Sequence, residues 1–168
     1  MMDHLWAPWR REFIDAPKEE GCIFCRYPAE TGREADRKNL IVARTAKSFA
    51  ILNRYPYNNG HLMVVPGRHT GDYASLDREE LDDLQHLLQV AVKVVDEVYH
   101  PAGANLGMNI GRDAGAGIDG HLHWHLVPRW RGDTNFMPVL AAAKVMIETL
   151  GQTWDALQPR FEASLSGA

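Results

Sequence analysis

The sequence has little of three features that define whole classes of protein. Only two of its 168 residues are cysteines, Cys22 and Cys25, which excludes a framework of disulfides. No apolar run approaches the roughly 20 residues of a membrane-spanning helix. The N-terminus also lacks the charged-then-apolar layout of a signal peptide. We therefore expect a cytoplasmic protein with no membrane partner.

Positive charge is also scarce. The chain has 18 Lys and Arg against 22 Asp and Glu, a formal net charge of -4, whereas sequence-independent binding of nucleic acid needs a basic surface. We expect no nucleic-acid partner. The chain has no internal repeat, and its length fits one domain. We expect one domain over residues 1–168, with an arm over 1–20 and a helical extension over 138–168.

The most informative feature present is a row of three histidines at alternate positions, His121, His123 and His125. Because strand side chains alternate between faces, an extended segment 121–126 puts the three imidazoles on one face and the apolar residues between them on the other. Pro128 is expected to end this strand. Imidazole is a nucleophile, a general acid or base and a metal ligand. The alternative is an ordinary strand rich in histidine, but the strict spacing favours a site.

The order of the expected elements predicts an α+β fold with an antiparallel sheet, since strands in succession suit hairpins better than repeated βαβ units. Apolar residues at helical spacing follow a helix-start signal in which Ser75 or Asp77 is the cap. Residues 28–38 are polar and are expected to form a loop. We expect strands at 40–44, 48–53, 61–66, 104–110 and 121–126, and helices from the cap to about 98 and over 140–157.

A glycine-rich segment precedes the histidines. Residues 113–120 read Asp-Ala-Gly-Ala-Gly-Ile-Asp-Gly, and glycines let backbone N–H groups approach phosphate oxygens closely. A flexible connection between strands would have the same composition. Beside three histidines in line, phosphate chemistry is the favoured interpretation.

Cys22 and Cys25 have the Cys-x-x-Cys spacing of half a zinc site. Two buried thiols in an apolar turn are an equally common reason for such a pair. A redox role is less favoured, because no thioredoxin-like βαβ pattern surrounds the motif. A zinc site would need two further ligands.

The pattern from His121 to Val127 resembles the signature of the histidine triad superfamily. Asn53, Pro56, the run 60–66 and His69 are similar to that family's first nucleotide-binding segment, and 105–109 to its second. Segments 6–10, 55–58 and 128–136 most resemble the diadenosine tetraphosphate phosphorylase branch. The resemblance covers residues 22–137.

The resemblance implies a homodimer with about five antiparallel strands, one long helix and a C-terminal helix. It implies an enzyme that cleaves dinucleoside polyphosphates at the α-phosphorus through a covalent nucleotidyl-His123, with His125 and His121 as the other catalytic histidines. The nucleotide-binding residues that it implies are Ile51, Leu52, Asn53, Asn109, Gly115, Gly117 and His125.

The resemblance also implies a structural zinc ion held by Cys22, Cys25, His69 and His121.

The sequence departs from the family pattern in the glycine-rich segment. Many members carry Gly-Gln-Ser or Gly-Gln-Thr where this chain reads Gly-Ala-Gly at 115–117. The difference removes a side-chain hydrogen-bond donor from the phosphate loop. The identity of the leaving group, and of the acid that protonates it, is therefore undecided from the sequence.

Several alternatives remain open at this point. The acceptor is inorganic phosphate or water, and Arg129 and Arg131, if they alternate on an extended chain, share a face that can hold an anion. Other candidate functions are a nucleoside phosphoramidate hydrolase, a non-catalytic nucleotide-binding protein and a metal-binding regulatory module. His4, His86 and His100 are expected at the surface, and the role of His61 is undecided.

Overall fold

A computed structural model describes residues 21–135 and 145–167. The expected N-terminal arm and the first residues of the expected C-terminal extension lie outside these ranges. Five antiparallel strands form one sheet in the order β1-β2-β3-β5-β4, which confirms the predicted class and strand number. The strands are β1 Ile41–Arg44, β2 Ser48–Leu52, β3 Leu62–Pro66, β4 Gly103–Met108 and β5 Trp124–Arg129. Among the described residues, no helix is long and apolar enough to cross a membrane.

The register of the sheet places one row of residues across four strands. Ile51 of β2 pairs with Met63 of β3, Met63 pairs with His125 of β5, and Gly107 of β4 pairs with His125 on its other side. Residues that are directly opposite in antiparallel strands share a face. The same face therefore carries Ile51, Met63, His125 and the side-chain-free position Gly107.

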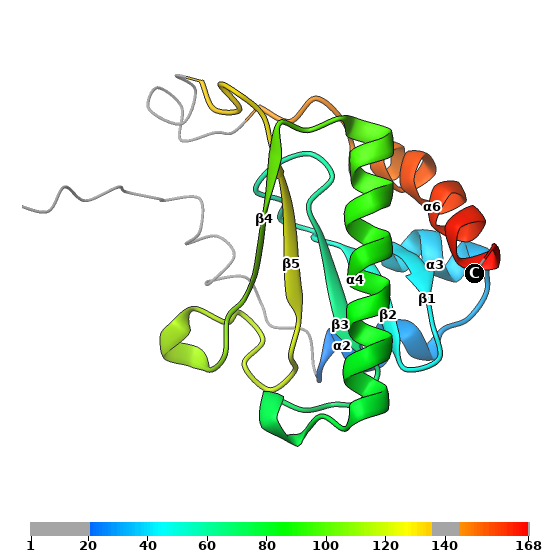
Figure 1. Cartoon of the computed structure of the whole chain (residues 1–168), viewed down its shortest axis with the longest axis vertical. Helices are drawn as coiled ribbons and strands as arrows, with labels where there is room; N and C mark the ends of the chain where they lie inside the picture. The colour runs from blue at the N-terminus through cyan, green and yellow to red at the C-terminus, as the bar shows by residue number, and fades with distance from the viewer. Residues whose placement is uncertain (1–20, 136–144, 168) are drawn as a thin grey trace, which may run out of the picture.

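The long helix α4, Arg78–Tyr99, lies against one face of the sheet, roughly along its strands (Figure 1), and buries a stripe of leucine, alanine and valine side chains. Its start is fixed by a capping box, in which the Asp77 carboxylate accepts from the backbone N–H of Glu80 and the Glu80 side chain accepts from that of Asp77. Asp77 is thus the cap. Ser75 belongs to the short helix η1, Tyr73–Ser75, that precedes it.

The polar stretch 28–38 is not the expected loop. Two short helices, α2 Ile23–Ala29 and α3 Arg33–Asn39, cover it in part. Arg44 donates to the backbone oxygens of Pro28 and Glu30 and to the Asp36 carboxylate. Helices this short gain most of their stability from such tertiary contacts, so their sequences need no amphipathic periodicity.

Strand β5 begins and ends later than predicted. His121 and His123 precede it, because the N–H of Leu122 donates to the carbonyl of Thr70 in the loop after β3 instead of to a neighbouring strand. Pro128 lies inside the strand. Proline has no backbone N–H to donate to a neighbouring strand. It is tolerated at position 128 because the pairing of β3 with β5 ends at Leu126, so no hydrogen bond to β3 is lost.

The C-terminal helix, α6 Leu150–Ser166, begins about ten residues later than predicted and packs against α4 and β1. Thr149 caps it through a reciprocal capping box with Gln152. The Trp154 indole N–H donates to the carbonyl of Ile41 at 2.7 Å, which fixes the helix to the first strand. The Thr-x-x-Gln pattern was the signal for this start.

Candidate active site and metal centre

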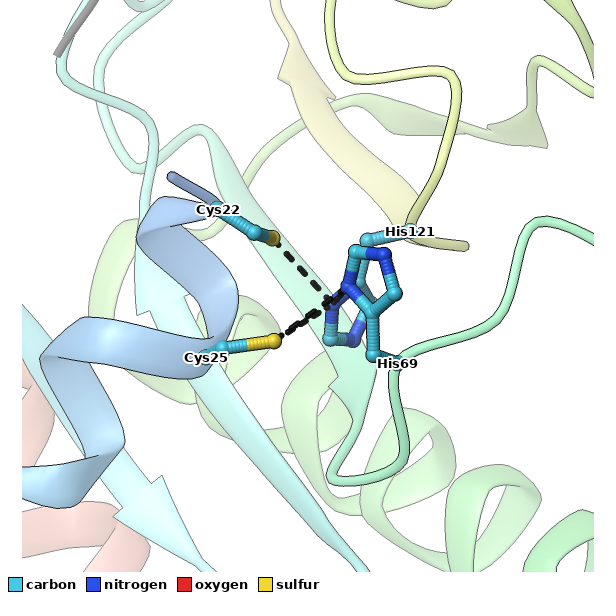
Figure 2. Close-up of side chains that lie close together, drawn as sticks. All are labelled: Cys22, Cys25, His69 and His121. Atoms are coloured by element: carbon cyan, nitrogen blue, oxygen red, sulfur yellow. Dashed lines mark hydrogen bonds between the residues drawn. The ribbon is translucent and has the colours of Figure 1, made fainter. Parts of the chain in front are cut away.

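Cys22, Cys25, His69 and His121 converge although they lie far apart in the sequence (Figure 2). Cys22 is the N-cap of α2 and Cys25 lies one turn further on, so both sulfurs leave the same side of the helix. His69 lies in the loop after β3, and His121 just before β5. One potential ligand atom from each residue lies within 4.8 Å of every other.

The spacing of these atoms fits tetrahedral zinc. With Zn–S near 2.3 Å and Zn–N near 2.0 Å, the edges of such a tetrahedron are roughly 3.3 Å between nitrogens and roughly 3.5 Å between sulfur and nitrogen. The two Nδ1 atoms of His69 and His121 are 3.3 Å apart. His121 Nδ1 lies 3.4 Å from the sulfur of Cys22 and 3.6 Å from that of Cys25. The donor set of two thiols and two imidazoles therefore fits the ion in both chemistry and distance.

The second ring nitrogen of His121 is also engaged. Its Nε2 lies 2.8 Å from the carbonyl oxygen of Pro66, which can only accept, so Nε2 carries the proton and Nδ1 presents its lone pair to the metal position. A metal ion bound to Nδ1 would leave His121 no free nitrogen for acid–base work on a substrate. The geometry thus favours the metal role over the catalytic role of this residue.

The imidazole of His123 is buried and held in one tautomer. Its Nδ1 lies 2.8 Å from the carbonyl oxygen of His121, so Nδ1–H donates and Nε2 keeps the lone pair. The ring of Phe24 packs 5.1 Å from it. Burial lowers the pKa of His123. A neutral imidazole with an unprotonated Nε2 is a nucleophile at neutral pH.

His61, whose role the sequence left undecided, is a fourth histidine of this site. The backbone N–H of Tyr57 donates to His61 Nδ1 at 3.0 Å, so Nε2 is the protonated nitrogen of neutral His61. That nitrogen lies 3.0 Å from Nδ1 of His125, which must accept. Neutral His125 therefore carries its proton on Nε2. As the first residue of the predicted strand 61–66, His61 gave no sign of this contact, and the observed strand β3 begins one residue later, at Leu62.

Burial keeps both of these rings neutral. Burial, with repulsion from His125 and His123, lowers the pKa of His61 to about 3. Burial, with repulsion from His123, lowers the pKa of His125 to about 4. The chain of donors that begins at the Tyr57 backbone thus persists at neutral pH, and His125 presents an N–H donor next to His123, whose ring centre is 5.0 Å away.

The other residues predicted for the nucleotide lie on both sides of this histidine group. The amide nitrogen of Asn53 is 3.4 Å from Nε2 of His61. Asn109 donates to the carbonyl of Gly115, whose left-handed conformation closes the short helix η2 Arg112–Ala114. Ile51 and Leu52 are buried in the core. Gly117 lies in the exposed part of the glycine-rich loop.

A cavity of about 400 Å³ opens beside His125. Its lining comprises Tyr57, Asn58, Asn105, Leu106, Gly107, Asn109, His125, Val127 and Arg129.

The prediction that Arg129 and Arg131 alternate on an extended chain and share an anion-binding face is wrong. Strand β5 ends at Arg129, residue 131 is part of a turn, and Arg129 forms a bidentate ion pair with Asp133.

The HIT domain family model matches residues 34–132, more than half of the chain. The chain belongs to the HIT domain family, whose name abbreviates the histidine triad that its sequence displays.

Two histidines outside the site, His86 and His100, are exposed as predicted. The third, His4, lies outside the described residues.

Named relatives carry related activities. The chain is 38% identical over 157 residues to an "AP-4-A phosphorylase" of Mycobacterium tuberculosis, covering 90% of this chain and 80% of that protein. It is 32% identical to "Adenosine 5'-monophosphoramidase hnt1" of Schizosaccharomyces pombe, covering 64% and 74%. A zinc-bound histidine triad family protein from Mycobacterium smegmatis shares the fold at a TM-score of 0.66 and 21% identity, covering 88% and 97%.

Proposed function

We propose that this protein is a phosphorylase of dinucleoside polyphosphates, which cleaves substrates such as diadenosine tetraphosphate at the α-phosphorus through a covalent nucleotidyl-His123. One observation carries the proposal: the Nδ1–H of His123 is bound to the His121 carbonyl, and Nε2 holds the lone pair next to the His125 donor. The 38% identity to a named diadenosine tetraphosphate phosphorylase supports this choice of substrate.

In the first step His123 Nε2 attacks the α-phosphorus, the bond from that phosphorus to the bridging oxygen breaks, and ATP departs with the bonding electrons. In the second step an oxygen of inorganic phosphate attacks the adenylyl-His123, and the P–N bond breaks to release ADP. His125 Nε2–H donates to the phosphate oxygens on which charge develops. The carbonyl of His121 stabilises the Nδ1–H of the imidazolium formed on attack.

Asn109, Asn53 and the glycine-rich loop are the groups proposed to orient the nucleotide. Asn109 contacts Gly115 at the start of the loop and shares the cavity wall with His125. Asn53 lies on the opposite side, against His61. We assign Ile51 to the floor below the base, because it is buried at the end of β2 and shares the face of His125, whereas the side chain of Leu52 lies on the opposite face in the row of Leu62 and Leu126.

The composition of the loop favours a polyphosphate over an amine as the leaving group. An alkylamine can leave the phosphorus only if its nitrogen takes up a proton, because an amine anion is far too basic to depart; even the neutral amine still binds a proton, as the pKa near 10.4 of the lysine ammonium shows. A terminal phosphate, with a second pKa near 6, departs without one. The loop reads Gly-Ala-Gly at 115–117 and offers no side-chain acid there. The phosphoramidate hydrolase therefore remains the second candidate, favoured only by the relative of that name.

We propose that the four-residue cluster of Figure 2 holds one structural zinc ion. Four protein ligands leave no position for water, so the metal would fix the fold locally and take no part in the reaction. Cys22, Cys25, His69 and His121 tie α2 and the loop after β3 to the segment before β5. The zinc-bound family neighbour supports the identity of the ion.

We further propose a homodimer joined through the sheets. Strand β4 lies at the edge, with β5 as its one neighbour in the described sheet, and its residues are mostly exposed. An exposed edge readily pairs with a second copy, and an isologous contact closes after two chains. Light scattering of the purified protein should give twice the mass of the chain.

The products identify the acceptor. Diadenosine tetraphosphate and inorganic phosphate should give ADP and ATP in equal amounts, at a rate that rises and saturates with phosphate. Transfer to water would give AMP and ATP whatever the phosphate concentration, and would move the assignment to a hydrolase. Release of ammonia from adenosine 5′-phosphoramidate at a higher kcat/KM than cleavage of the dinucleotide would favour the second candidate.

A further inference from the structure

The proposed reaction uses only one end of the cavity beside His125. Within the sheet, β3 separates β2 from β5, while β4 lies on the other side of β5. Asn53, at the end of β2, and the cavity along β4 therefore lie on opposite sides of His125. A mononucleotide bound through Asn53, with its phosphate at His125, leaves most of this cavity unfilled.

We infer that the cavity along β4 and β5 binds the second nucleoside of the dinucleoside polyphosphate, the half that departs with the leaving phosphates. This inference rests on the proposed function and assigns a subsite within it. A volume of about 400 Å³ lies within the range of small-molecule sites, roughly 300–1,000 Å³. A substrate whose phosphates lie at His125 would then extend to both sides of that residue.

The lining suits a flat and uncharged polar group. Tyr57 is 46% exposed at the cavity, and its ring packs 4.8 Å from His61, which holds it in place as a stacking surface for a base. Asn105 accepts from Arg129 at 2.9 Å, so its own amide N–H groups remain to donate to ribose or base. Amides and an aromatic ring recognise a nucleoside better than an ion.

Charge argues against free phosphate as the occupant. Among the described residues of the lining, Arg129 is the one cationic side chain, and Asp133 pairs with it through both carboxylate oxygens. Asn58 donates to the same carboxylate at 2.7 Å and to the carbonyl of Pro128 at 2.8 Å, which holds Asp133 in position. The local charge is therefore balanced, and an anion gains little there.

Gly107 allows the cavity to be filled without breaking a contact. It lies opposite His125 in the ladder, its φ is outside the left-handed range, and a Cβ built on it meets no atom within 4 Å. Gly107→Val therefore adds bulk to the cavity in a strand that favours β-branched residues. Gly103→Val is the matched control, because Gly103 lies on the same edge strand with the same open surroundings and is outside the lining.

The test is calorimetric binding of two methylene-bridged, uncleavable analogues: diadenosine tetraphosphate, and the same four-phosphate chain with one adenosine. Gly107→Val should raise the Kd of the dinucleoside analogue at least about tenfold and that of the mononucleoside analogue less than about twofold. Gly103→Val should change neither. Equal weakening of both analogues, or of neither, would overturn the subsite.

Tyr57→Leu provides a second test of the subsite, for use if Gly107→Val changes the oligomeric state of the protein. Loss of the ring should weaken the dinucleoside analogue more than the mononucleoside analogue, whereas Tyr55→Leu, a nearby exposed tyrosine outside the cavity, should affect both alike. Equal effects of Tyr57→Leu on the two analogues would also overturn the subsite. Turnover of diadenosine tetraphosphate by the wild type is a separate result, which tests the proposed function.

Discussion

At the scale of single residues, the roles of the histidines follow from what each second ring nitrogen contacts. The carbonyl of Pro66 leaves the lone pair of His121 on Nδ1, as the proposed metal ligand requires, and the carbonyl of His121 leaves the lone pair of His123 on Nε2, as the proposed nucleophile requires. The Tyr57 backbone N–H fixes the tautomer of His61, and the protonated Nε2 of His61 in turn fixes the tautomer of His125. Three identical side chains at alternate positions thus have three different hydrogen-bond partners, which is the basis of the three roles proposed for them. The spacing predicted that they form a group, but tautomers depend on backbone atoms that are distant in the sequence.

The buried histidines should make the protein sensitive to acid. His61 has a pKa lowered to about 3 in the folded chain, against about 6.5 when unfolded. The unfolded state therefore binds more protons below pH 6.5, and stability falls as the pH drops through this window. For this one group the loss between pH 6.5 and 5 is about 2 kcal/mol.

Denaturant unfolding of wild type and His61→Gln at several pH values measures this loss. The difference in unfolding free energy between the two proteins should shrink as the pH falls from 6.5 to 5, while effects of pH on metal binding are common to both. His86→Gln, at an exposed position, is the control and should keep the wild-type slope. A difference between His61→Gln and wild type that stays constant with pH would contradict a neutral, buried His61.

At the scale of elements, predictability depends on whether a segment is held by its own pattern or by other segments. Helix α4 was predictable because its apolar stripe and its cap are both local. Helix α3 was missed, since its seven residues are held by contacts such as that of Asp36 with Arg44. The late start of β5 was hidden for the same reason, because it depends on the bond from Leu122 to Thr70.

The cap of α4 gives a local test of stability. Asp77→Ala removes the acceptor for the backbone N–H of Glu80 and should lower the unfolding free energy by about 1 kcal/mol. The control is Asp82→Ala, which removes only an exposed ion pair with Arg78 and should change stability much less. Thermal or denaturant unfolding of both variants decides the point, and equal losses would contradict the role of Asp77.

The four candidate metal ligands join α2, the loop after β3 and the segment before β5. If they hold zinc, elemental analysis should find about one ion per chain, and a chelator should lower the Tm of the wild type, because metal binding is coupled to folding. Cys25→Ser should lower the Tm as well, with no further effect of the chelator. A wild type that carries no zinc after expression in zinc-supplemented medium, and whose Tm is unchanged by added zinc or chelator, would contradict the site.

At the scale of the whole molecule, one face of the sheet gathers the chemistry. The register aligns Ile51, Met63, His125 and Gly107 across four strands, with Phe24 of α2 packed beside the triad. The sequence predicted the sheet from its hydrophobic patterns and the triad from its spacing, and the resemblance to the family predicted that Cys22, Cys25, His69 and His121 lie together. The cavity along β4 could not be predicted, since it results from the pairing of β4 with β5, which places Gly107 opposite His125.

The central claim is that His123 carries the nucleotidyl group during the reaction. Intact-protein and peptide mass spectrometry after a rapid acid-free quench, with diadenosine tetraphosphate and no phosphate, tests it most directly. We expect one adenylyl group on His123, its discharge to ADP when phosphate is added, and no adduct on His123→Ala. An adduct on another residue, or a folded His123→Ala protein that keeps more than about one thousandth of the wild-type kcat, would contradict the account.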